Sequence, residues 1–279
     1  MQFVMAMALL ASAAADGVVL KPVANVYSRP SNDADVVSQA IYASHISVIE
    51  EHDGWAHVGT ADEYTGWMAA ADFKRLGPDE RIYASSGRVA HVNSLFANLY
   101  REGSVTKHQP VLTVPFETTL EIIQEVDGAE RWLEVRLPND RRVWIQRGDS
   151  TFDRKPMSIE GVITLSKRFL GLPYSWGGTS SFGFDCSGFT QMLCRRRGIV
   201  IPRDTSLQVK WAGAAPVERN DLQAGDLLFF GESKVTHTGI YIGDGKFISA
   251  TTHDRPVVQI SDLADPFWTK RFIAARRPK

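Results

Sequence analysis

The sequence contains little cysteine, with only Cys186 and Cys194 among its 279 residues. Two cysteines cannot supply the disulfide framework on which small secreted domains rely. On one helix, residues eight positions apart lie about 12 Å from each other along the axis, which is too far for a disulfide. We therefore expect two free thiols in a chain that folds around hydrophobic cores, since 44% of its residues are apolar.

The sequence also lacks an excess of either charge. Its 31 Lys and Arg residues nearly balance 32 Asp and Glu residues, and the basic residues are dispersed along the chain. Because such a surface offers no electrostatic footprint, we expect no nucleic-acid partner and no stable membrane insertion. No metal-binding cluster, phosphate-binding loop or nucleotide fingerprint is apparent, so we expect no metal and no cofactor. A small or neutral ligand is the expected partner.

Apolar runs of any length are absent except at the start, where the sequence reads MQFVMAMALLASAAADG. This stretch has the length of a signal peptide and ends in small residues, although it lacks a positively charged beginning. We interpret residues 1–16 as a signal remnant, which would place the protein in the cell envelope, periplasm or medium. The alternative is an apolar strand or helix packed on the body of a cytoplasmic protein. A run of about 15 residues is too short to span a bilayer comfortably.

Residues 17–150 have the pattern of short strands separated by Gly, Pro, Asn and Asp. Within them, Ala24–Tyr27 aligns with Ala97–Tyr100. The same alignment pairs Asp53-Gly54 with Asp127-Gly128, and pairs Trp55 and Trp67 with Trp132 and Trp144. We interpret this as a repeat of one small β-barrel, with copies at 17–78 and 79–152, rather than chance similarity between β-rich segments.

The pattern changes in residues 153–279. Apolar spacing predicts a helix that begins after Ser158 and stops at Gly171, and a second helix from about Asp185 to Arg197. Strands are expected at 227–230, 238–242, 246–250, 257–260 and 272–275. Two helices packed on an antiparallel sheet make an α+β domain.

The chemistry-bearing residues of this domain are a cysteine and a histidine. Cys186 lies in the first turn of the second predicted helix, where unpaired N–H groups and the helix dipole favour a thiolate. Cys194 lies near the opposite end and is expected to be a core residue. From Ser158 onward only His237 and His253 could act as a base, and Gly239 would allow close approach to His237. A cysteine nucleophile needs such an imidazole and a third group that orients it.

These residues carry a family resemblance. The sequence has "PYSWGG" ahead of "DCSGF", and "GDLLFF" ahead of "HTGIYIGDGKFI". With these motifs in this order, residues 157–279 resemble, roughly over that range, the NlpC-type cell-wall cysteine peptidases. The resemblance implies a papain-like α+β fold with Cys186 as nucleophile and His237 as general base. It also implies an oxyanion site made by backbone N–H groups near Cys186 and by Tyr174.

The first repeat resembles bacterial SH3-like domains, with "NVYSRP" at its start and Gly66-Trp67 near its end. The second copy departs from that pattern, with Arg101-Glu102-Gly103 and Val143-Trp144 in the corresponding places. The whole order is similar to that of γ-D-glutamyl-L-diamino acid endopeptidases, which implies murein stem peptides as substrates. The nature of the diamino acid is left open.

The third catalytic group is where the sequence departs from the family. His, Asn or Gln usually stands twelve residues after the base, and here that position is Ser249. Either Ser249 or His253, four residues further on, could orient the imidazole of His237. A catalytically weakened wall-binding protein is the alternative, as is a thiol-dependent amidase or acyltransferase on the same core.

Five further residues are candidates for substrate binding. A free amino terminus on the substrate would require carboxylates, and Asp185 and Asp204 are expected to supply them. Asp204 lies in a "PRD" segment that the family associates with the substrate amino terminus. Ser187 and Thr205 would add hydroxyl groups, and Tyr64 of the first repeat would cover the pocket. The plainer alternatives are a helix cap for Asp185, a turn residue for Asp204 and a barrel-surface residue for Tyr64.

Overall fold

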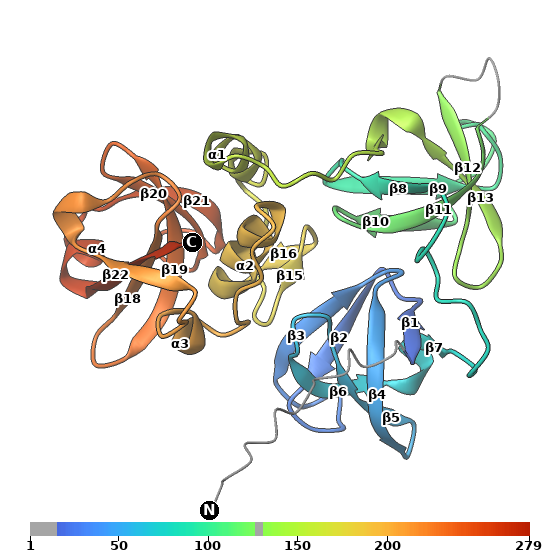
Figure 1. Cartoon of the computed structure of the whole chain (residues 1–279), viewed down its shortest axis with the longest axis horizontal. Helices are drawn as coiled ribbons and strands as arrows, with labels where there is room; N and C mark the ends of the chain where they lie inside the picture. Colours follow the sequence, from blue (N-terminus) through green and yellow to red (C-terminus); the bar gives the residue numbers. More distant parts are fainter. Residues whose placement is uncertain (1–15, 126–130) are drawn as a thin grey trace, which may run out of the picture.

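The structure is a computed structural model that describes residues 16–125 and 131–279. The proposed signal remnant, up to residue 15, and the Asp127-Gly128 turn lie outside the described residues. The chain forms two strand-rich bodies, drawn blue and green in Figure 1, and a third body that contains most of the helices, drawn yellow to red.

The first body is a seven-stranded antiparallel sheet in the order β3-β2-β6-β5-β4-β1-β7. Its elements are β1 (Gly17–Val19), β2 (Val23–Tyr27), β3 (Val36–Ile41), β4 (His45–His52), β5 (Trp55–Gly59), β6 (Thr65–Ala69), the 3₁₀ turn η1 (Ala70–Asp72) and β7 (Phe73–Arg75). Alternate residues of these strands point inward and form one core that includes Val26, Val58 and Met68. The predicted turn at Asp53-Gly54 is present, with positive φ at both residues, as a two-residue hairpin requires.

The second body repeats this strand order with every number raised by seven. Its sheet runs β10-β9-β13-β12-β11-β8-β14. The elements are β8 (Val89–Val92), β9 (Phe96–Tyr100), β10 (Leu112–Pro115), β11 (Thr119–Glu125), β12 (Trp132–Arg136), β13 (Arg142–Gln146), η2 (Arg147–Asp149) and β14 (Ser150–Thr151). Tyr27 and Trp55 meet edge to face at 5.5 Å in the first body, and Tyr100 and Trp132 do so at 5.6 Å in the second.

The third body is an antiparallel sheet in the order β17-β22-β18-β19-β20-β21 with helices on both faces. Its elements are α1 (Ile159–Lys167), β15 (Thr179–Ser180), β16 (Gly183–Phe184), α2 (Cys186–Arg196), α3 (Thr205–Gln208), β17 (Ala214–Val217), η3 (Arg219–Asp221), β18 (Leu227–Gly231), β19 (Val235–Gly243), β20 (Lys246–Thr251), β21 (Val257–Asp262), α4 (Pro266–Arg271) and β22 (Phe272–Pro278). Residues of α1 and α2 pack on Ile240 and Ile248, whereas Trp268 of α4 packs on Phe230 and Phe247.

The helix starts agree with the capping signals of the sequence. Ser158 accepts a hydrogen bond from the Gly161 N–H at 3.1 Å, and Asp185 accepts one from the Gly188 N–H at 2.6 Å. The expectation that α1 continues to Leu170 is wrong, because the chain tightens into 3₁₀-type bonds after Lys167. The elements α3, α4 and β17 were not expected from the sequence, since four to six residues are too few to show a period.

Two side-chain hydrogen bonds join the third body to the first. Gln191 of α2 donates one to Asp62, and Arg203, which pairs with the N-cap residue Asp185, donates one to Ser38. Within residues 16–125 and 131–279, no helix combines the length and the apolar character that a bilayer crossing needs.

Glu117 joins the second body to the third. This residue is only 7% exposed, and its carboxylate pairs with Arg154 and Arg195, each at 2.6 Å. Burial opposes its ionisation, but Arg195 and Arg154 hold the pKa of Glu117 below its usual range.

We expect Glu117→Ala to lower the free energy of unfolding by about 1–3 kcal/mol, because it leaves two guanidinium groups without their anion. Both arginines are about one-third exposed, so water will recover part of the loss. Urea denaturation followed by circular dichroism measures the change. Glu102→Ala removes an exposed pair with Lys107 and should change stability by less than about 1 kcal/mol. Equal effects of the two substitutions would contradict a special role for Glu117.

Candidate active site

Cys186 is the first residue of α2 and is 7% exposed. Its Sγ lies 3.6 Å from Thr205 Oγ1 and accepts a hydrogen bond from the backbone N–H of Thr238, the residue after His237. The structure therefore brings the predicted nucleophile and the strand of the predicted base together. The expectation that the helix terminus favours a thiolate is not met, because burial and the charge of Asp185 raise the pKa of Cys186 to about 11.

His237 lies on β19, and its imidazole is held from several sides. Nε2 is 3.1 Å from the hydroxyl of Ser249, a fully buried residue of β20. The ring of Trp268 lies 5.0 Å away at an interplanar angle of 31°. Burial is the main cause that lowers the pKa of His237 to about 3, and His253 contributes in the same direction. The neutral imidazole is therefore the resting form.

Gly239 makes room for this arrangement. A Cβ at position 239 would lie 2.7 Å from the ring of Phe247 and 3.0 Å from Cβ of Ser249. Any side chain there would push Ser249 away from His237. The close approach expected of this glycine from the sequence is therefore a packing requirement.

His253, the other candidate for orienting His237, faces a different partner. Its ring stacks on Phe267 at 3.8 Å and 7°, and its Nε2 lies 3.7 Å from a carboxylate oxygen of Asp254. Among the described contacts, the hydrogen bond to the His237 ring comes from Ser249. Of the two residues, the structure brings Ser249 against the imidazole.

Asp185 does more than cap α2. Its two carboxylate oxygens accept hydrogen bonds from Arg203 at 3.1 and 2.6 Å, and Arg203 also donates to the hydroxyl of Ser187 at 2.8 Å. Arg203 is 2% exposed and Asp185 is 8% exposed. Arg203 was not among the residues expected at the site, although it stands in the same "PRD" segment as Asp204. Because Asp185 is already neutralised, it has little capacity left for a second cation.

Asp204 and Tyr64 form a second polar pair beside this one. They share a side-chain hydrogen bond, which brings the first body to the site. Burial raises the pKa of Asp204 despite the opposing charge of Arg203, and burial and the charge of Asp204 raise the pKa of Tyr64. A raised pKa marks Asp204 as the carboxylate whose charge is incompletely compensated.

Tyr174 and Cys194 complete the set of residues singled out from the sequence. Burial raises the pKa of Tyr174, so its phenol stays protonated and able to donate. Cys194 packs in a core with Ile201 and Phe229, as expected, and burial raises the pKa of its thiol to about 12. In the described residues, no group of three or more His, Cys, Asp and Glu side chains could hold a metal ion.

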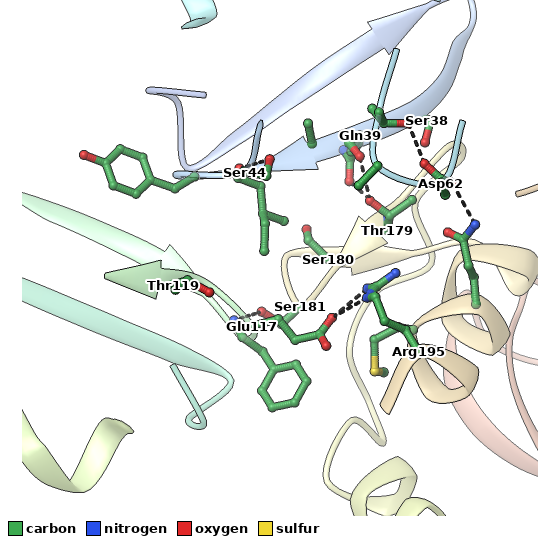
Figure 2. A pocket seen from close by; sticks show the side chains of 18 of the residues that line it. Ser38, Gln39, Ser44, Asp62, Glu117, Thr119, Thr179, Ser180, Ser181 and Arg195 are labelled. Carbon is green, nitrogen blue, oxygen red and sulfur yellow. Dashed lines mark hydrogen bonds and ion pairs between the residues drawn. The ribbon is translucent and has the colours of Figure 1, made fainter. Parts of the chain in front are cut away.

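A separate cavity of about 310 Å³ lies where the three bodies meet. Figure 2 shows its walls, among them Asp62 and Gln39 of the first body, Glu117 of the second, and Ser180 and Arg195 of the third. Neither Cys186 nor His237 lines it.

Comparisons with known proteins follow the same division of the chain. A family model described as the NlpC/P60 family matches residues 171–277, and one described as the bacterial dipeptidyl-peptidase Sh3 domain matches residues 26–73. A protein of Bacillus cereus named gamma-D-glutamyl-L-lysine dipeptidyl-peptidase is 31% identical over 270 residues, which cover 88% of this chain and 76% of that protein.

Two further matches have different extents. The murein DD-endopeptidase MepH of Escherichia coli is 39% identical over 113 residues, which cover 39% of this chain and 41% of that protein. The crystal structure of an NlpC/P60 family protein from Bacillus cereus has a TM-score of 0.80 at 27% identity. It covers 95% of this chain and 99% of its own.

The lowered pKa of His237 predicts a dependence of stability on pH. The pKa of His237 is about 3 in the folded chain and close to 6.5 when the chain is unfolded. Below pH 6.5 the unfolded chain therefore binds a proton that the folded chain refuses, and stability falls as the pH drops toward 3. Between pH 7 and pH 5.5 we expect the wild-type chain to lose about 1 kcal/mol more than His237→Asn does. Urea titrations of both proteins at the two pH values measure this difference, and identical losses would refute it.

Proposed function

The chain belongs to the NlpC/P60 family and is a peptidoglycan endopeptidase, and we propose that Cys186 and His237 are its nucleophile and general base. The bond cut is the γ-D-glutamyl–diamino acid bond of murein stem peptides that carry a free N-terminal L-Ala. The names of the relatives from Bacillus cereus and Escherichia coli support a murein peptide substrate. A cell-envelope or secreted location is proposed with it.

The observation that carries the substrate proposal is the charge of the pocket beside Cys186. Asp185 and Arg203 neutralise each other, and Asp204 adds one further carboxylate that lacks a full partner. These three groups together carry a net charge of −1, which suits a single ammonium group. Tyr64 covers this pocket from the first body through its hydrogen bond to Asp204. A substrate whose amine is blocked would bring no cation to Asp204.

The chemistry follows from the neutral resting pair. Sγ of Cys186 attacks the γ-carbonyl carbon of D-Glu while its proton passes to the free nitrogen of His237. The developing oxyanion accepts hydrogen bonds from backbone N–H groups at the start of α2 and from the phenol of Tyr174. His237 then protonates the leaving amine of the diamino acid, which leaves a thioester on Cys186. A water molecule that gives its proton to His237 hydrolyses the thioester and restores the thiol.

The remaining assignments are proposed on the strand order. The body from 79 to 152 repeats the strand order of the body from 17 to 78, part of which matches the SH3 family model. We assign both as SH3-like barrels in front of a papain-like domain at 153–279. Of the two, the first barrel supplies a residue, Tyr64, to the pocket.

The orientation of the base gives one prediction. Ser249→Ala removes the hydrogen bond to Nε2 of His237, and we expect kcat to fall about tenfold, because a misplaced imidazole transfers protons less efficiently. His253→Ala leaves that bond in place and should keep kcat within about twofold. Hydrolysis of a murein tripeptide measures both. If neither change lowers kcat, another group orients His237; if both variants keep the fold but the wild-type chain itself is inactive, the weakened wall-binding protein is the better assignment.

The substrate proposal gives another prediction. The free tripeptide L-Ala-γ-D-Glu-diamino acid should be cleaved at least about a hundredfold faster than its N-acetylated form, because the acetyl group removes the cation that Asp204 binds. Asp204→Asn should narrow this preference by raising KM for the free peptide alone. Cys186→Ala should abolish cleavage, whereas Cys194→Ala should retain it. Chromatography of the products measures the cleavage of both peptides by the wild-type chain and by the three variants. Equal rates on the free and acetylated peptides would exclude the amine pocket.

A further inference from the structure

The turn that carries Tyr64 has a defined conformation. It lies between β5 and β6, with Ala61 to Glu63 at its tip. The N–H of Thr60 donates to the carbonyl of Tyr64 at 2.9 Å and closes the turn. The Glu63 N–H donates to the Thr60 carbonyl at 2.9 Å, and Glu63 has φ of 63°. A tight turn followed by one left-handed residue is a common three-residue hairpin, so the positions of its side chains are fixed relative to one another.

Asp62, at the tip of this turn, is bonded to the helix of the nucleophile. Its Oδ2 accepts a hydrogen bond from Nε2 of Gln191 at 2.8 Å, and its Oδ1 accepts one from the hydroxyl of Thr60 at 2.5 Å. Gln191 is 4% exposed and lies on α2, five residues after Cys186. In Figure 2 the carboxylate of Asp62 points across the junction, and a dashed line joins it to the amide nitrogen of this side chain.

Gln191 depends on this contact. Its second amide hydrogen donates to the Ile201 carbonyl at 3.1 Å, so both donors of the amide are used. Without Asp62, one buried N–H would lose its acceptor. The hydrogen bond that Gln191 donates to Asp62 is therefore costly to replace by a bond to water.

The other contacts between the first and third bodies arise elsewhere. Ser38 and Gln39, which bond Arg203 and Thr179, lie on β3. Among the residues that the structure describes, the turn from Thr60 to Tyr64 reaches the third body by two side-chain hydrogen bonds, those of Asp62 and of Tyr64. Tyr64 pairs with Asp204, the residue before Thr205, whereas Asp62 bonds Gln191 on α2.

We infer that Asp62 is a positioning residue for substrate selection, which fixes the turn on α2 and thereby holds Tyr64 over the pocket. The inference rests on the proposed function, since it requires that Tyr64 covers a pocket for a free amine. Among the described hydrogen bonds, the side chain of Asp62 bonds Gln191 and Thr60, and neither Cys186 nor His237. It should therefore affect the binding of the amine-bearing end of the substrate and leave the rate of the bound complex nearly unchanged.

The test measures KM and kcat of Asp62→Ala and Asp62→Asn on the free and N-acetylated tripeptides. For Asp62→Ala we expect KM for the free peptide to rise about tenfold and kcat to stay within about twofold, so that the preference for the free peptide falls about tenfold. Asp62→Asn should behave like the wild-type chain, because its amide can accept from Gln191 and donate to Thr60. Glu63→Gln, on the exposed neighbour in the same turn, is the matched control and should change neither constant.

A second comparison tests whether Asp62 acts through Tyr64. In a Tyr64→Phe background, Asp62→Ala should have little further effect, because the residue that it positions no longer bonds Asp204. Full addition of the two effects would overturn the inference, as would an unchanged KM in Asp62→Ala. A wild-type preference for the free peptide that survives Asp62→Ala removes this inference alone, whereas a wild-type enzyme without any preference removes the proposed function as well. Thermal unfolding of each variant shows that the fold is retained.

Discussion

The buried ion pair between Asp185 and Arg203 is the interaction on which the site depends. Two charges removed from water are stable only when their remaining hydrogen-bonding groups are also satisfied. Arg203 meets this condition through both oxygens of Asp185, the hydroxyl of Ser187 and the hydroxyl of Ser38. One guanidinium group thus contacts Asp185, which caps α2, Ser187, which follows Cys186, and Ser38 on β3 of the first body. Cys186 lies in the middle of this arrangement.

Burial also explains the protonation states of Cys186 and His237. A thiolate and an imidazolium would each lose hydration on burial, so the resting site holds the neutral form of both. The start of a helix does favour an anion, yet this effect is smaller than the desolvation at Cys186. In the proposed mechanism, charge is separated only during attack, when Sγ of Cys186 transfers its proton to His237. The two charges then stabilise each other.

Much of this structure could be predicted from the sequence. Ser158 and Asp185 correctly predicted the starts of two helices. The repeated Asn, Tyr and Trp positions predicted two bodies of one kind, and these have the same strand order. Local signals of this kind lie within a few residues of each other. The choice between Ser249 and His253 could not be made, since it depends on how β19 and β20 pair and on the aromatic ring of α4. Arg203 was missed for the same reason, because its partners lie 16 to 165 residues away along the chain.

The hydrogen bonds of α2 to the first barrel also bear on biosynthesis. Ser38 and Asp62 leave the ribosome 165 and 129 residues before Arg203 and Gln191. The first body can therefore fold early, but its partners become available only after the second body and the first part of the third have been made. Contacts of such high sequence separation form late. A nascent or truncated chain would carry a folded first body that still lacks its hydrogen-bond partners Gln191 and Arg203.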